Sequence, residues 1–194
     1  MATSFTTAAQ RSAGLLFVLL LWLVVPAQAQ DSTLTRLIRQ NQYALTANGT
    51  QFSGAGWDKI QASIQQSQYV LLGESHGTAQ VPQFAAAVAQ VLKPAVYVAE
   101  IDPSAAQTLT RLAAQPGPPT AYLRQYPDAL CFYSWAEEFD LIRTLRAQQI
   151  RLVGLDQLFI ASAAPFYAQL AGQVKSKSAR AYLQRRAASY QAQA

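Results

Sequence analysis

The sequence contains little of the side-chain chemistry on which many active sites depend. Among its 194 residues it has one cysteine, Cys131, and one histidine, His76. A single cysteine excludes an internal disulfide and any metal site built from several cysteines. Cys131 stands in an aromatic stretch with no histidine nearby, which favours a buried, unreactive thiol over a nucleophile. Any imidazole chemistry in this sequence therefore depends on His76.

Charged residues are also scarce, and acidic residues are the scarcer kind. Charged residues of both signs make up 13% of the chain, with 15 Lys and Arg against 10 Asp and Glu. The carboxyl-terminal part carries a basic cluster without acids, formed by Lys175, Lys177, Arg180, Arg185 and Arg186. Such a cluster can bind anions or nucleic acid, but its spacing also fits one solvated face of a helix. We favour the solvated face and expect no nucleic-acid partner.

The longest apolar run lies near the amino end. Leu15 to Val25 follows Arg11 and precedes Pro26-Ala27-Gln28-Ala29, an Ala-x-Ala pattern. A run of this length is too short to span a hydrocarbon core of ~30 Å. The order of charge, apolar run and small residues is typical of a secretory signal peptide. We therefore predict a signal peptide at residues 1–29, cleavage near Ala29, a secreted or periplasmic protein, and no transmembrane segment in the mature chain.

The remaining residues, 30–194, are predicted to form a single α/β domain. An unbroken apolar run predicts a buried strand at 69–73, and two further largely apolar runs predict strands at 95–99 and 150–155. Apolar residues at helical spacing predict helices at 79–92, 104–114, 135–148 and from about 163 onward. Alternating strands and helices predict a parallel, or mostly parallel, sheet flanked by helices. Three strands make a small sheet, so either the pattern hides a further strand or the chain is a shortened form of a longer domain.

The polar turn after the first predicted strand contains the best functional candidates. Glu74 and His76 stand between Gly73 and Gly77, which let the backbone bend tightly. Ligands of open α/β sheets bind outside the carboxyl ends of the strands, where this turn is predicted to lie. A neighbouring carboxylate raises the proton affinity of an imidazole and selects its tautomer, so His76 is suited to be a general base. The same pair could instead bind a divalent metal.

Acidic residues also follow the other two predicted strands: Glu100 and Asp102 after the second, and Asp156 after the third. Each of these acids also has a possible structural role. Asp102 precedes Pro103, as an N-cap residue often does. Asp156 could cap a turn, and Glu100 could pair with an arginine. Because three strand ends share one edge of a parallel sheet, we nevertheless predict a common cleft. We expect it to bind a small-molecule substrate or ligand.

These segments together resemble a known group of proteins. Leu-Leu-Gly-Glu-Ser-His-Gly-Thr at 71–78, Val-Ala-Glu at 98–100 and Leu-Val-Gly-Leu-Asp at 152–156 are similar to the erythromycin esterase-like and ChaN-like superfamily, which includes haem-binding uptake and Tiki-like proteins. The likeness extends from Tyr69 to Gln157, under half of the chain. The spacing of Glu74 and His76 is closer to the ChaN-like branch, and the Gly-Leu-Asp ending is closer to the esterase branch.

The resemblance implies a hydrolytic α/β domain that cleaves an ester-type bond. His76 would activate water and Glu74 would orient it, while Glu100 and Asp156 would line the site. It equally leaves open a haem- or iron-binding protein of the ChaN-like type, or a catalytically degenerate domain. The cofactor stays open: the residues would allow a divalent metal, with His76 and Glu74 as ligands, and the ChaN-like branch would imply haem.

Overall fold

The computed structural model describes residues 32–193, and the chain divides into two units between Ala44 and Leu45. In the first unit, residues 32–40 are helical. The predicted signal peptide and its cleavage site lie outside the described residues. Among residues 32–193, no helix is long and apolar enough to cross a membrane.

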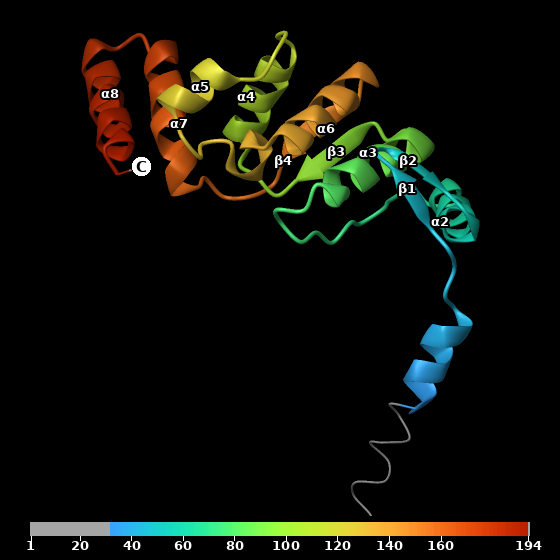
Figure 1. The fold of residues 1–194 in the computed structure, drawn as a ribbon. Helices are drawn as coiled ribbons and strands as arrows, with labels where there is room; N and C mark the ends of the chain where they lie inside the picture. Colours follow the sequence, from blue (N-terminus) through green and yellow to red (C-terminus); the bar gives the residue numbers. More distant parts are fainter. Residues whose placement is uncertain (1–31, 194) are drawn as a thin grey trace, which may run out of the picture. The chain divides into compact units, whose positions relative to one another are not determined.

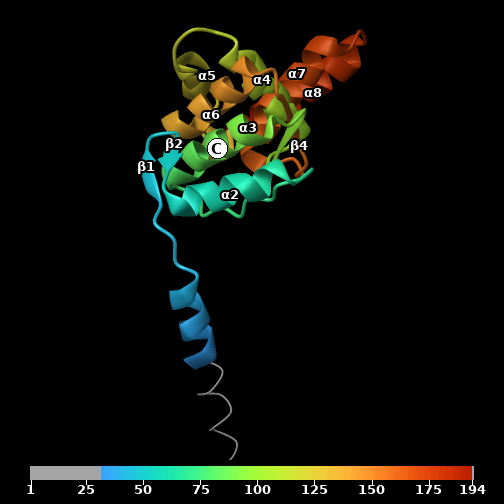
Figure 2. The ribbon, with the colours of Figure 1, turned by 90° about the vertical axis from the view of Figure 1, so that its right-hand side faces the viewer.

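The second unit begins with a small antiparallel hairpin that the sequence pattern did not predict. Strands β1 (Thr46–Asn48) and β2 (Gln51–Ser53) pair with Asn48 opposite Gln51. Gly49 lies in the turn with a φ of 58°, a left-handed conformation that glycine adopts easily. Each strand has only three residues, too few for an alternating pattern to show. Helix α2 (Ala55–Gln65) follows and packs against α3 (Gln80–Leu92) (Figure 2).

The predicted parallel sheet is present, but it has two strands. Strand β3 (Val96–Ala99) pairs in parallel with β4 (Arg151–Gly154), and Ala99 lies opposite Gly154. The chain between them forms α4 (Pro103–Ala113), α5 (Thr120–Gln125), the 3-10 helix η1 (Cys131–Ser134) and α6 (Ala136–Ala147) (Figure 1). The prediction of a parallel sheet with flanking helices is therefore confirmed for these two strands.

The predicted strand at 69–73 is wrong. Residues 69–73 have no regular secondary structure, and the side chains of Tyr69 and Leu71 are 84% and 95% exposed. A cavity of about 560 Å³ is lined by residues 68–72 together with residues of α3 and β3. An apolar run becomes a strand only when a neighbouring strand accepts its backbone hydrogen bonds. Among the described residues, β3 has β4 as its one paired neighbour.

The core lies between one face of this sheet and helices α3, α4 and α6. Its fully buried apolar side chains are Ile101, Leu109, Leu130, Ile142 and Leu145. Tyr97 and Leu152 pack against this cluster, whereas Val98, which neighbours Tyr97 in β3, is 52% exposed. Successive strand residues point to opposite faces, so the helices cover the face that carries Tyr97.

The carboxyl-terminal part forms two helices, α7 (Ile160–Gln173) and α8 (Lys177–Gln191), which pack against each other (Figure 1). The rings of Tyr167 and Tyr190 stack at 5.5 Å, and the Arg186 guanidinium lies 4.9 Å from the Tyr190 ring centre. The other members of the basic cluster are exposed on or next to α8.

The junction after β4 requires a glycine. A Cβ atom on Gly154 would lie 2.5 Å from the carbonyl oxygen of Ile101 and 2.6 Å from that of Asp102. The backbone N–H of Asp156 donates to the Ile101 carbonyl at 3.0 Å, which holds the two segments in this close contact. The end of β4 and the turn after β3 are therefore fixed against each other.

We predict that Gly154→Ala destabilises the fold because the new methyl group forces these two segments apart. Overpacking of this kind costs ~1–3 kcal/mol of unfolding free energy. Urea unfolding followed by circular dichroism would measure the loss. Gly172→Ala is the matched control, because space is open around Gly172 within α7 and alanine there favours the helix by ~0.5–1 kcal/mol. Equal stability of the Gly154→Ala variant and the wild type would contradict the prediction.

Candidate functional site

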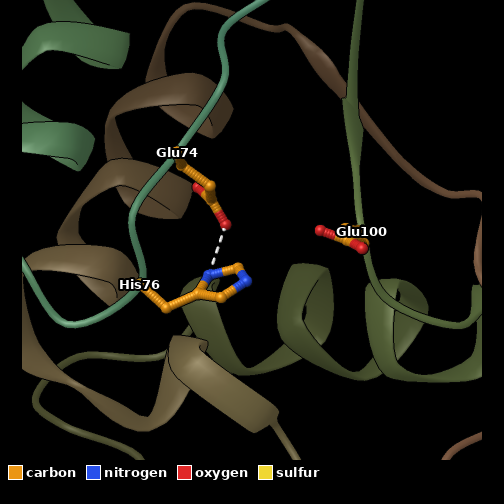
Figure 3. Close-up of side chains that lie close together, drawn as sticks. All are labelled: Glu74, His76 and Glu100. Carbon is orange, nitrogen blue, oxygen red and sulfur yellow. Dashed lines mark ion pairs between the residues drawn. The ribbon is translucent and has the colours of Figure 1, made fainter. Parts of the chain in front are cut away.

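The contact between Glu74 and His76 is the centre of the candidate site. His76 Nδ1 lies 2.8 Å from Glu74 Oε1 (Figure 3). The turn is closed by a hydrogen bond from Thr78 Oγ1 to the Ser75 carbonyl at 2.9 Å, and Gly77 takes a φ of 87°. A carboxylate at Nδ1 favours the tautomer with the proton on Nδ1, which leaves a lone pair on Nε2.

The imidazole ring is oriented by an aromatic neighbour as well as by Glu74. The rings of His76 and Phe132 stack with centres 3.7 Å apart and planes 8° apart. Phe132 belongs to η1 and also contacts Trp135, with ring centres 5.9 Å apart. The packing of η1 therefore fixes the plane of the imidazole, although the His76 side chain stays 38% exposed.

Glu100 reaches the same place from the end of β3. Glu74, His76 and Glu100 each offer a nitrogen or oxygen atom, and these atoms lie within 4.8 Å of one another. In Figure 3 the Glu100 carboxylate faces the His76 ring from the side opposite to the turn that carries Glu74 and His76. The structure thus brings together three of the five predicted site residues, and these three could hold a metal ion.

Asp102 lies apart from this group and has a structural role. Its side chain is 2% exposed. Its Oδ1 accepts the backbone N–H groups of Ser104 and Ala105, both at 2.9 Å, which caps the amino end of α4. Its Oδ2 accepts the Ser162 hydroxyl at 2.8 Å. Because both oxygens are engaged inside the protein, the geometry matches the N-cap alternative.

Asp156 also lies outside the three-residue group. Its Oδ1 accepts the backbone N–H of Gln157 at 2.7 Å, and its own N–H is bonded to Ile101. The side chain therefore serves the local turn after β4. Its place at the sheet edge agrees with the predicted topology, and its contact with a ligand stays a prediction.

Glu138 is a candidate site residue that the sequence pattern did not single out. It lies in the first turn of α6 and is 7% exposed. Burial, followed by the charge of Glu74, raises the pKa of its carboxyl to about 7, and the charge of His76 opposes the shift. The sequence holds one sign of this burial. Glu138 stands four residues before the buried Ile142, so the two side chains share one face of the helix.

Two tyrosines lie near these acids. Burial, followed by the charges of Glu74 and Glu138, raises the pKa of Tyr97 to about 12. Burial also raises the pKa of Tyr133, followed by the charges of Tyr97 and Glu138. Both phenols therefore keep their protons at neutral pH and remain hydrogen-bond donors. Burial likewise raises the pKa of the Cys131 thiol, which argues against a thiolate nucleophile.

Comparisons of the chain with models of protein families, with curated proteins and with solved structures find no match. The resemblance to the erythromycin esterase-like and ChaN-like superfamily therefore stays a prediction from the three segments quoted above.

The raised pKa of Glu138 predicts that the fold loses stability as the pH rises. In the unfolded chain this carboxyl loses its proton near pH 4.5, whereas in the fold it keeps the proton up to about pH 7. Between these values the folded state binds more protons, so the free energy of unfolding falls as the pH rises, by ~3 kcal/mol at most. Glu138→Gln should remove this dependence, and Glu137→Gln on the exposed side of α6 should retain most of it, because the charge of Glu137 is the smallest contribution to the raised pKa.

Urea unfolding with a chelator present, below, within and above this pH window, would measure the effect for the wild type and both variants. A Glu138→Gln variant that keeps the full pH dependence would show that another group causes it.

We also predict that Asp102 stabilises the fold more than Asp156 does. Asp102→Ala removes an N-cap worth ~1–2 kcal/mol and a buried hydrogen bond worth ~1 kcal/mol. Asp156→Ala removes one bond to a neighbouring N–H and should change the unfolding free energy by ~0.5 kcal/mol or less. Thermal unfolding of both variants would test this, and equal losses would contradict the structural role of Asp102.

Proposed function

We propose that this protein is an exported hydrolase of the erythromycin esterase-like and ChaN-like superfamily, which cleaves an ester-type bond with water activated at His76. The observation that carries the proposal is the 2.8 Å contact between His76 Nδ1 and Glu74 Oε1. It leaves Nε2 on the side of the ring that faces Glu100 (Figure 3). Export is inferred from the amino-terminal sequence pattern alone.

The geometry suits activation of water because the imidazole is held in one tautomer and one orientation. Glu74 keeps the proton on Nδ1 and stabilises positive charge on the ring, while Phe132 supports the ring plane. Nε2 then accepts a proton from the water while the water oxygen bonds to the acyl carbon. The ester bond breaks, the imidazolium returns the proton to the leaving alkoxide, and the products are a carboxylic acid and an alcohol. An oriented group of this kind contributes ~100- to 10,000-fold in rate.

The surroundings of His76 indicate what the substrate looks like. The imidazole is 38% exposed, so a small molecule can reach it from solvent. Phe132 lies against one face of the ring, and Trp135 next to it is 46% exposed. Exposed aromatic surface beside the reacting group favours an apolar substituent near the scissile ester. We therefore expect esters with an apolar acyl or aryl group to react faster than short polar ones.

We predict that His76→Ala abolishes this activity. A panel of chromogenic esters with acyl chains of increasing length, with and without divalent metal, would be tested on the wild type and the variant. Loss of the imidazole should lower kcat/KM by ~100- to 10,000-fold. Glu137→Gln is the control, because it removes an exposed carboxylate from α6 outside the three-residue group and should keep wild-type activity. Circular dichroism would confirm that each variant is folded.

A wild type that hydrolyses no ester in the panel, or a folded His76→Ala variant as active as the wild type, would contradict the hydrolase. Hemin titration would then test the alternative of a haem-binding protein. A visible absorption band that appears with hemin and is lost in His76→Ala would support that alternative.

A further inference from the structure

A second cavity differs in chemistry from the candidate site and shares none of its three residues. It is formed by the β1–β2 hairpin with α2 and α3, elements that lie next to one another in Figure 2. Its volume of about 570 Å³ is in the range of small-molecule sites. Four amide and three hydroxyl side chains line it, and none of the described residues in its lining is charged.

The hairpin contributes most of these polar side chains. Thr46 lies opposite Ser53, and Asn48 lies opposite Gln51. Because side chains alternate along a strand, all four project from one face of the hairpin, and all four line the cavity. Within residues 32–193, none of these side chains makes a hydrogen bond to another residue. Their donors and acceptors are therefore available to a ligand.

Trp57 adds an indole N–H without a partner. It lies in the first turn of α2, is only 8% exposed, and lines the cavity together with Gln61. No hydrogen bond of this N–H is found in the described part of the chain. Every polar side-chain atom sealed from solvent there has a partner, so the N–H is open to the cavity that Trp57 lines. A largely buried indole N–H normally has an acceptor, which a ligand would supply here.

Aromatic packing holds the indole and the cavity walls in place. The ring centres of Phe52 and Phe84 lie 5.3 Å and 6.0 Å from that of Trp57. Phe52 and Phe84 are themselves in edge contact, with centres 5.4 Å apart. These rings come from β2, α2 and α3, so the cluster fixes all three elements around the cavity. A preformed site of this kind loses little conformational entropy when a ligand binds.

The lining favours a neutral ligand that is rich in hydroxyl groups. A charged ligand would meet no opposite charge among the residues that line the cavity. An apolar ligand would leave the amide groups unpaired, which costs binding free energy. A side-chain amide offers both donors and acceptors, and each hydroxyl group of a sugar does the same. Sugar oxygens can also accept the N–H of Trp57.

We propose that this cavity binds a carbohydrate. The Trp57 N–H donates to a sugar oxygen, and the amides of Gln61, Gln90 and the hairpin exchange hydrogen bonds with sugar hydroxyl groups. The site uses neither Glu74 nor His76, so it is independent of the proposed hydrolase. A free short sugar and the sugar units of a polysaccharide share this chemistry, and the experiment distinguishes them.

The test is a titration of the full chain with the uncharged disaccharides maltose, cellobiose and chitobiose, followed by calorimetry and tryptophan fluorescence. We expect saturable binding of one disaccharide per chain and a change in emission, because Trp57 contacts the ligand. The affinity should be equal at low and high salt, since no charge pair is screened. Pelleting of the protein with insoluble cellulose or chitin tests a polysaccharide ligand.

Three variants locate the site. Gln61→Ala and Gln90→Ala each remove one amide from the cavity, and alanine favours the helices that carry them. Trp57→Phe keeps an aromatic ring and removes the N–H. Each variant should weaken binding ~2- to 10-fold through the loss of one hydrogen bond. Gln83→Ala is the matched control, because it removes an amide from α3 outside the cavity and should bind as the wild type does.

Disaccharide binding that weakens in Gln61→Ala and Gln90→Ala, but not in Gln83→Ala, would support the site with a free sugar as its ligand. Pelleting with the same variant pattern, without disaccharide binding, would support the site with a polysaccharide as its ligand. Failure of the wild type to bind any probe would overturn the proposal. So would wild-type affinity in the Gln61→Ala and Gln90→Ala variants, whose folding circular dichroism would check.

Discussion

The buried carboxylate of Asp102 connects three parts of the second unit. Its oxygens accept two backbone N–H groups at the start of α4 and the hydroxyl of Ser162 in α7. The backbone at this point also presses against Gly154, so the end of β4 is fixed with it. Because Glu100 precedes this junction by two residues, its backbone position is set by the same contacts. The most constrained region of the sheet edge therefore carries one of the three residues of the candidate site.

The other two residues depend on weaker support. Glu74 and His76 lie in an irregular segment, and their turn is closed by one hydrogen bond between Thr78 and Ser75. The stacking of His76 on Phe132 supplies the tertiary contact that a paired strand would otherwise provide. The site thus combines a carboxylate on a rigid sheet with an imidazole whose position depends on η1. Ligand binding between them would join the two parts.

The negative charge of the acids at the candidate site affects the pKa values of the groups around it. Burial of Glu138 near Glu74 raises its pKa, and burial together with the same acids raises the pKa of Tyr97. Protonation of Glu138 relieves part of this charge. The hydrolase needs an oriented imidazole, which Glu74 and Phe132 supply.

The sequence alone determined the elements whose signals are local. The apolar runs of β3 and β4, the N-cap before Pro103 and the amphipathic pattern of α6 each depend on residues close in the chain, so they were predictable. Tertiary structure decided the rest. An apolar run at 69–73 became no strand, because pairing depends on a neighbour that the run does not contain. The sequence also did not predict the burial of Glu138, or that Asp102 and Asp156 lie outside the three-residue group. Each of these features depends on contacts between distant segments.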